Sequence, residues 1–126
     1  MSKFKFWIPP ILYMALIFWL SSRPSPDQIR LIPIIAGLKL VHVIEYGILY
    51  FLFWWALVNT TSYNWIQIFM IAFSLTVLYG MSDEFHQLFV ASRTSRFMDV
   101  VADGVGGIIS QGMISMFNKN RGALTK

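Results

Sequence analysis

The sequence predicts an all-α fold, an integral membrane four-helix bundle with both termini on the cytoplasmic side. Hydrophobic residues make up 56% of the chain, and charged residues make up 13%, half of the roughly 25% found in soluble domains. The apolar residues gather in four long runs, which are too long and too evenly apolar for the strands of a membrane barrel. Because lipid cannot satisfy backbone polar groups, we expect these runs to be helices.

The composition also excludes several classes of protein. The chain has too few charged residues to cover the water-exposed surface of a soluble enzyme. It is also too hydrophobic to be a disordered chain. The chain has no cysteine, which excludes disulfides, thiolate catalysis and cysteine-ligated metal sites. The net charge is +4, and the charged residues lie between the apolar runs. This placement is better explained by the orientation of a membrane protein than by phosphate contacts, so no nucleic-acid partner is expected. The 126 residues are predicted to form a single transmembrane domain, 1–126.

The first predicted helix covers residues 6–21. Pro9 and Pro10 fall in its first turns, where a missing amide donor costs least. Its apolar part is short for a membrane span, so a cleavable signal peptide is an alternative. The polar segment that follows has no Ala-x-Ala cleavage site, and the run is rich in aromatic residues. Both features favour a permanent helix.

The second and third predicted helices cover residues 38–58 and 65–87, and each is long enough to span a membrane. A short uncharged polar turn separates them. The second helix carries its polar residues early, and residues 50–58 are wholly apolar. The third helix stays apolar through Leu78 and carries its polar residues late. The pair is therefore predicted to be polar at one end only.

The fourth predicted helix covers residues 97–117 and is followed by a basic tail. It opens with Asp99 and Asp103 and is rich in glycine. Small residues recur at every fourth position, which lets a neighbouring helix approach closely. These small residues are Ala102, Gly106 and Ser110. Basic residues divide almost evenly between the two sides of the predicted bundle. Because positive charge at the N-terminus usually sets the orientation, both termini are predicted to be cytoplasmic.

The polar residues of the last three helices meet on one side of the membrane because successive helices alternate in direction. Ionisable groups inside a membrane are functional by default, although a structural ion-pair network is the alternative. We expect these side chains to line a crevice that opens to the outer leaflet. The expected ligand-binding residues are Lys39, His42, Asp83, Glu84, Gln87, Arg93, Asp99 and Asp103.

Several chemistries fit such a crevice. Lys39 and Arg93 suit a phosphate or a carboxylate, since the arginine fork matches these anions. Crowded carboxylates suit general acid–base catalysis, so whether the protein is an enzyme stays open. A metal site is conceivable, since His42 with Glu45 forms His-x-x-Glu and Asp83, Glu84 and His86 lie close in sequence, but these spacings match no strong metal motif. No metal site and no cofactor are therefore expected. The candidate catalytic residues are His42, Glu45, Asp83 and Asp99.

Five motifs follow one another along the chain: Leu20-Ser21-Ser22, Lys39-x-x-His42 with Tyr46, Asp83-Glu84-x-x-Gln87, Arg93 with Asp99, and Gly106. Together these motifs resemble the VanZ-like membrane family over about residues 7–110. Three positions depart from the family's pattern. Asp103 stands where the family usually has asparagine, Ser92 where a glycine often precedes the arginine, and Ser110 where a later glycine is usual.

The resemblance implies a multi-pass protein of the bacterial cytoplasmic membrane that works in the cell envelope. The family's namesake is similar to proteins that confer low-level resistance to teicoplanin and related lipoglycopeptides. The expected partner is a membrane lipid or a lipid-linked cell-wall precursor at the outer leaflet. Two alternatives stay open: a membrane-embedded enzyme that modifies such a lipid, and a small structural subunit of a membrane complex. The sequence leaves the oligomeric state undetermined.

Overall fold

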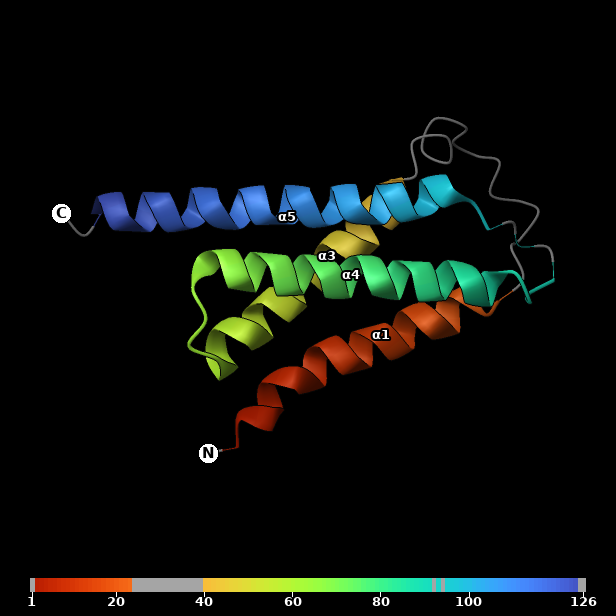
Figure 1. Cartoon of the computed structure of the whole chain (residues 1–126), viewed down its shortest axis with the longest axis horizontal. Helices are drawn as coiled ribbons and strands as arrows, with labels where there is room; N and C mark the ends of the chain where they lie inside the picture. The colour runs from red at the N-terminus through yellow and green to blue at the C-terminus, as the bar shows by residue number, and fades with distance from the viewer. Residues whose placement is uncertain (1, 24–39, 92, 94, 125–126) are drawn as a thin grey trace.

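The computed structural model describes residues 2–23, 40–91, 93 and 95–124, and its described elements are helical. In the membrane bundle that they form, four helices are long and apolar enough to cross a membrane, which confirms the predicted fold class. Figure 1 shows both termini at the same end of this bundle. The elements are η1 (Lys3–Trp7), α1 (Ile8–Ser21), α3 (Leu40–Thr60), α4 (Trp65–Gln87) and α5 (Phe97–Leu124).

Local sequence explains where the helices begin. Pro9 lies in the first turn of α1, where the missing amide donor has no intrahelical partner to lose. The short 3-10 helix η1 precedes α1 and lengthens this first membrane span. Asn64 and Gln67 form a reciprocal capping box at the start of α4, each side chain bonding the other's backbone amide at 3.0 Å. Helix α5 continues to Leu124, beyond the predicted end at residue 117.

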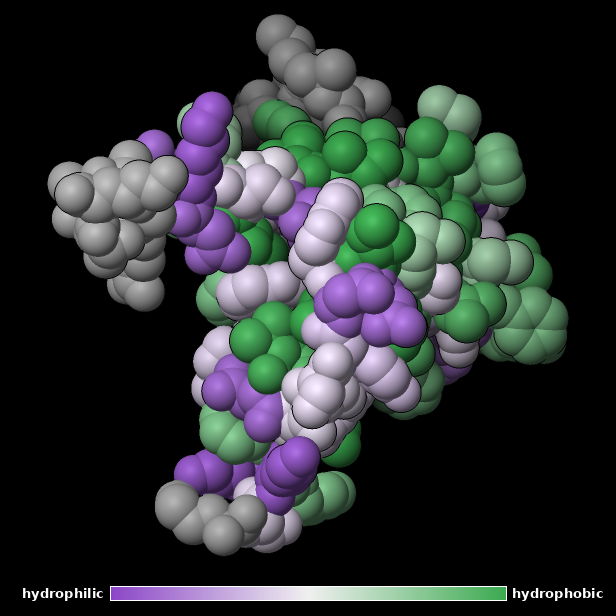
Figure 2. Space-filling model, turned by 60° about the vertical axis from the view of Figure 1, so that its left-hand side comes forward, coloured by the Kyte–Doolittle hydropathy of each residue, from purple (hydrophilic) through white to green (hydrophobic). Residues whose placement is uncertain are grey.

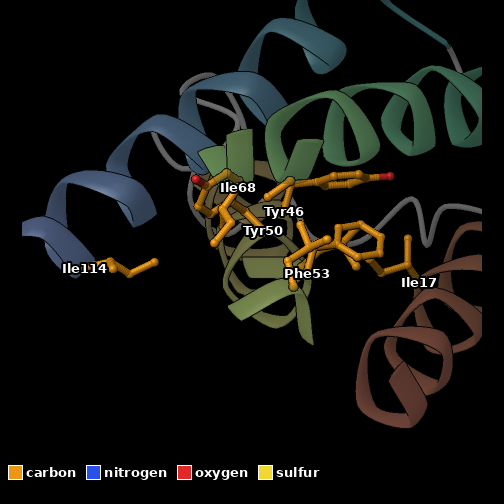
Figure 3. Packing of buried hydrophobic residues seen from close by; sticks show 9 residues of the cluster. Ile17, Tyr46, Tyr50, Phe53, Ile68 and Ile114 are labelled. Carbon is orange, nitrogen blue, oxygen red and sulfur yellow. The ribbon is translucent and has the colours of Figure 1, made fainter. Parts of the chain in front are cut away.

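Helix α3 lies at the centre of the bundle and packs most extensively against α5, then against α4 and α1. In Figure 1, α4 and α5 run side by side in opposite directions, and α3 crosses them. Side chains from all four helices converge in the apolar core (Figure 3). The largest buried members of this core include Ile17, Tyr46, Tyr50, Phe53, Ile68 and Ile114.

The contact between α3 and α5 is a backbone-to-backbone contact at two glycines. A Cβ atom on Gly106 would collide with the carbonyl oxygen of Val43 and would lie 3.0 Å from the amide nitrogen of Gly47. A Cβ atom on Gly47 would in turn lie 3.2 Å from the carbonyl oxygen of Gly106. The close helix approach expected from the small-residue pattern is therefore present at Gly106. This contact sets the distance between the two helices that carry His42 and Asp103.

The outer surface of the bundle suits a lipid environment. Large apolar side chains are exposed along all four helices, as a membrane-spanning bundle requires. Figure 2, which brings the end with the termini forward, shows hydrophilic residues gathered there and hydrophobic residues over the flank. At this end Lys3 Nζ donates a hydrogen bond to the carbonyl oxygen of Thr60 at 3.1 Å. The cytoplasmic location of this end stays a prediction from the charge pattern.

Candidate functional site

A polar cluster lies at the end of the bundle opposite the termini. Figure 1 shows the last turns of α4 and the first turns of α5 side by side there, and a contact of His42 joins the start of α3 to them. His42 is half-buried, and the acidic members are buried. Lys39, which we also predicted for this site, lies outside the described residues. The buried members from α4 and α5 are Asp83, Glu84, Gln87, Asp99 and Asp103.

His42 and Asp103 form the link between α3 and α5 within the cluster. The Nδ1 atom of His42 lies 3.0 Å from Oδ1 of Asp103, so the ring nitrogen donates and the carboxylate accepts. Gly80 of α4 makes room for this carboxylate, since a Cβ atom there would collide with it. The ring of Tyr46 stacks on the histidine at 6.2 Å between centroids. Asp103 is thus paired at the position where the family pattern has asparagine.

Asp83 and Gln87 form a second buried pair, one helical turn apart on α4. The amide nitrogen Nε2 of Gln87 donates to Oδ2 of Asp83 at 3.0 Å. The other carboxylate oxygen, Oδ1, is buried and has no hydrogen-bond partner among the described residues. The hydroxyl of buried Tyr46 is likewise without a partner in the described part of the chain. Both atoms therefore have hydrogen-bonding capacity that the described residues do not use.

Glu84 connects the cluster to a pocket between α4 and α5. Its Oε2 atom accepts a hydrogen bond from the backbone amide of Arg96 at 3.0 Å, at the N-terminal end of α5, where negative charge is favoured. The pocket has a volume of about 280 Å³, and Glu84 and Arg96 are its charged members. The other lining residues are Met81, Phe85, Leu88, Ser95, Phe97 and Val100.

Three ligand-type side chains from three helices come close together beside this pocket. His42 of α3, Glu84 of α4 and Asp99 of α5 each offer one atom, and these three atoms all lie within 4.8 Å of one another. Sequence spacing suggested a different pairing, of His42 with Glu45 one turn along the same helix. Glu45 is half-buried and lies outside this group of three. The candidate catalytic residues are thus divided, with His42 and Asp99 together and Asp83 bonded to Gln87.

Arg93 lies against the end of α1. Its Nε donates to the carbonyl oxygen of Arg23 at 3.0 Å, and its Nη2 donates to that of Leu20 at 3.2 Å. Beside it, His86 Nε2 lies 2.9 Å from the hydroxyl of Ser22. Carbonyl groups at a helix end need such partners, so Arg93 docks the end of α1 onto the segment that follows α4, and His86 adds a contact from α4 itself.

We expect Arg93→Lys to loosen the end of α1, because a single ammonium cannot reproduce the two forked hydrogen bonds. The loss should be about 1 kcal/mol of local stability. Hydrogen–deuterium exchange of the amides of residues 20–23 measures it directly. Lys119→Ala, at the opposite end of the bundle, is the control and should leave these amides unchanged. Equal exchange in wild type and Arg93→Lys would contradict the docking role.

Two glycines that shape the site were not assigned this role from the sequence. Gly80 makes room for the Asp103 carboxylate, and Gly47 brings the backbone of α3 against α5. A lone glycine in a membrane helix is itself a signal of close helix contact, and this signal was available. The contact between Ser22 and His86 was also missed, because the two residues lie far apart in the chain and no spacing rule joins them.

The chain matches a protein-family model over most of its length. The VanZ/LLP1 family model matches residues 6–118, which cover most of each of the four membrane helices and every residue of the polar cluster. The chain belongs to the VanZ/LLP1 family. The searches of curated proteins and of solved structures returned no match. This VanZ/LLP1 protein therefore has the four helices of a multi-pass membrane protein, with polar chemistry gathered at one end.

Proposed function

We propose that this VanZ/LLP1 protein binds the anionic headgroup of an envelope lipid or lipid-linked cell-wall precursor at the outer leaflet of the bacterial cytoplasmic membrane. The observation that carries the proposal is the pocket between α4 and α5, which joins an apolar wall to a charged end. A ligand that fits such a pocket has both an apolar chain and a polar headgroup. The outer-leaflet position follows from the predicted cytoplasmic location of the opposite end.

The apolar wall supports contact with a lipid chain. Phe85, Leu88 and Phe97 line the pocket and are exposed, as expected of side chains that face lipid. Arg96 is exposed at the same pocket, and its planar guanidinium suits a phosphate or a carboxylate. An acyl or isoprenoid chain along the wall would place its headgroup at Arg96.

The buried cluster behind the pocket supports contact with hydroxyl or amine groups of the same headgroup. Oxygen atoms of Asp83, Glu84 and Asp103 are buried and have no hydrogen-bond partner among the described residues. A buried acceptor that stays unpaired costs free energy, so a ligand that donates hydrogen bonds to it gains affinity. Sugar hydroxyls and amines of envelope lipids are donors of this kind.

Lipid retained through purification tests the proposal. The full-length protein is expressed in a Gram-positive host and purified in mild detergent, and the bound lipid is extracted and quantified by mass spectrometry. We expect one class of anionic lipid to be enriched over bulk membrane lipid. Arg96→Ala should retain about tenfold less of it, because a hydrogen bond to a charged group contributes about 1.5–3 kcal/mol. Lys119→Ala, which removes a cation at the other end, should retain the wild-type amount.

Teicoplanin susceptibility tests the consequence for the cell. At equal membrane levels, wild type and Lys119→Ala should raise the inhibitory concentration of a sensitive host, and Arg96→Ala should not. Bound lipid that only mirrors the bulk membrane would contradict lipid recognition. Protection by Arg96→Ala equal to that of wild type would contradict a role of this pocket in resistance.

A second candidate function is modification of the same lipid. It rests on the hydrogen bond between His42 and Asp103, since a histidine oriented by a carboxylate suits general acid–base catalysis. Incubation of the purified protein with envelope lipids separates the two functions. A binder returns every lipid at its original mass, whereas an enzyme produces a new mass that His42→Gln abolishes.

A further inference from the structure

We propose that His42, Glu84 and Asp99 bind one divalent transition-metal cation where α3, α4 and α5 meet. The three residues supply one imidazole nitrogen and two carboxylate oxygens from three different helices. This site goes beyond lipid recognition, and it contradicts our expectation from sequence spacing that the protein holds no metal. Its cation-binding claim stands independently of the proposed function.

The geometry is close to that of a coordination shell. The three ligand atoms lie within 4.8 Å of one another. Ligand atoms about 2.1 Å from a tetrahedral ion are roughly 3.4 Å apart, so side-chain movements of about 1 Å would bring all three into range. Because each ligand comes from a separate helix, the bound cation would also hold the three helices together.

Asp103 positions the histidine for this role. Its Oδ1 atom accepts a hydrogen bond from Nδ1 of His42 at 3.0 Å, which leaves Nε2 of the ring available to a cation. A histidine that ligates a metal commonly donates its other ring hydrogen to a carboxylate in this way, which fixes its tautomer and orientation. Tyr46, stacked on the ring, and Gly80, which gives the carboxylate room, hold this arrangement in place.

The burial of Glu84 is the independent observation that points to a ligand. The residue is 5% exposed, and its Oε1 atom has no hydrogen-bond partner among the described residues. Two further carboxylates, those of Asp83 and Asp103, are buried close by in the same helices. His42 forms an ion pair with Asp103. A divalent cation would compensate two negative charges at once and give Glu84 its missing partner.

The donor set indicates the class of cation. One nitrogen and two oxygens suit Zn²⁺ or Mn²⁺ better than Ca²⁺, which takes oxygen ligands only. Three protein ligands leave coordination positions open, and Glu84 also lines the pocket between α4 and α5. If the proposed function holds, the cation would connect the acidic cluster to the phosphate of the lipid headgroup.

Ion titration of the full-length protein tests the site. Detergent-purified protein is stripped with a chelator and titrated with MnCl₂ and with ZnCl₂ by calorimetry, and we expect one ion per chain. His42→Gln and Glu84→Gln should each lower the affinity by at least about tenfold, and Asp103→Asn by about tenfold through its effect on His42. His86→Gln changes the histidine outside the group, is the matched control, and should bind as wild type does.

The outcomes are decisive in both directions. Binding of neither ion to the stripped wild type, or wild-type affinity in His42→Gln, overturns the site. Should a variant fail to fold, pulsed electron paramagnetic resonance of Mn²⁺ on the wild type decides instead. Coupling to one imidazole nitrogen supports the site, and no nitrogen coupling overturns it. Ion binding without lipid enrichment would support this site and contradict the proposed function. Lipid enrichment without ion binding would support the proposed function and contradict this site.

Discussion

Replacing His42 with alanine is expected to lower the free energy of unfolding by about 3 kcal/mol, the lower end of the range for broken buried pairs. Asp103 is 1% exposed and would lose the donor that now lies 3.0 Å from its Oδ1. The side chain of His42 is 20% exposed, so the pair is not fully buried. The expected loss of stability therefore lies at the lower end of the range. Unfolding in detergent, followed by tryptophan fluorescence in the presence of a chelator, measures this loss without any contribution from bound metal.

The double variant His42→Ala/Asp103→Asn is the control for this interpretation. Asparagine removes the buried charge, so the double variant should recover most of the stability lost in His42→Ala. Asp103→Asn alone should cost less than His42→Ala, because its carbonyl oxygen still accepts from the ring. If His42→Ala lost less than about 1 kcal/mol, the pair would contribute no more than a solvent-exposed ion pair does, and the expected role of burial would be contradicted.

Gly106→Ala is expected to cost about 3 kcal/mol, at the upper end for overpacked sites. The added methyl would collide with the backbone carbonyl of Val43. Backbone cannot rotate away as a side chain does, so α3 and α5 must separate. Separation also pulls His42 from Asp103, so ion binding should weaken together with stability. Thermal unfolding should show a midpoint lower by on the order of 10 °C.

Gly112→Ala supplies the matched control on the same helix. A Cβ atom at Gly112 meets nothing within 4 Å, so the same substitution adds no collision there. It should be neutral or stabilise the protein by up to about 1 kcal/mol, because alanine restricts the unfolded chain and favours the helix. If both substitutions shifted the midpoint equally, the close contact at Gly106 would not control stability.

The fold was predictable because bilayer thickness and hydropathy act on each helix separately. The predicted end of the third helix at residue 87 agrees with the end of α4. The predicted C-terminal end of the last helix, at residue 117, was wrong, because α5 continues to Leu124. Its basic tail reads as a loop in a hydropathy profile, yet polar residues continue a helix readily once it leaves the membrane. The family, too, was predictable, because its motifs are local spacings of residue types.

The site was predictable only as a location. The positions of polar residues such as His42 and Asp83 along their helices, together with alternating helix directions, predicted that these residues meet at one end. Periodicity does not determine how neighbouring helices rotate or how closely they approach. For that reason spacing suggested His42 with Glu45, whereas the bundle pairs His42 with Asp103. Periodicity also does not show that Nε and Nη2 of Arg93, a predicted ligand residue, bond the end of α1.

The sequence by itself determined the membrane environment, the number of spans, the family and the end of the bundle where polar chemistry gathers. Each follows from properties that a helix has before it packs. Only the tertiary structure decided which polar atoms meet. The backbone contact of Gly47 with Gly106 and the space left by Gly80 place Asp103 against His42, and they leave Glu84 and Asp99 within reach of the same imidazole. The physical reason is that contacts across helices depend on interhelical distances to within a fraction of an ångström, and no one-dimensional pattern contains these distances.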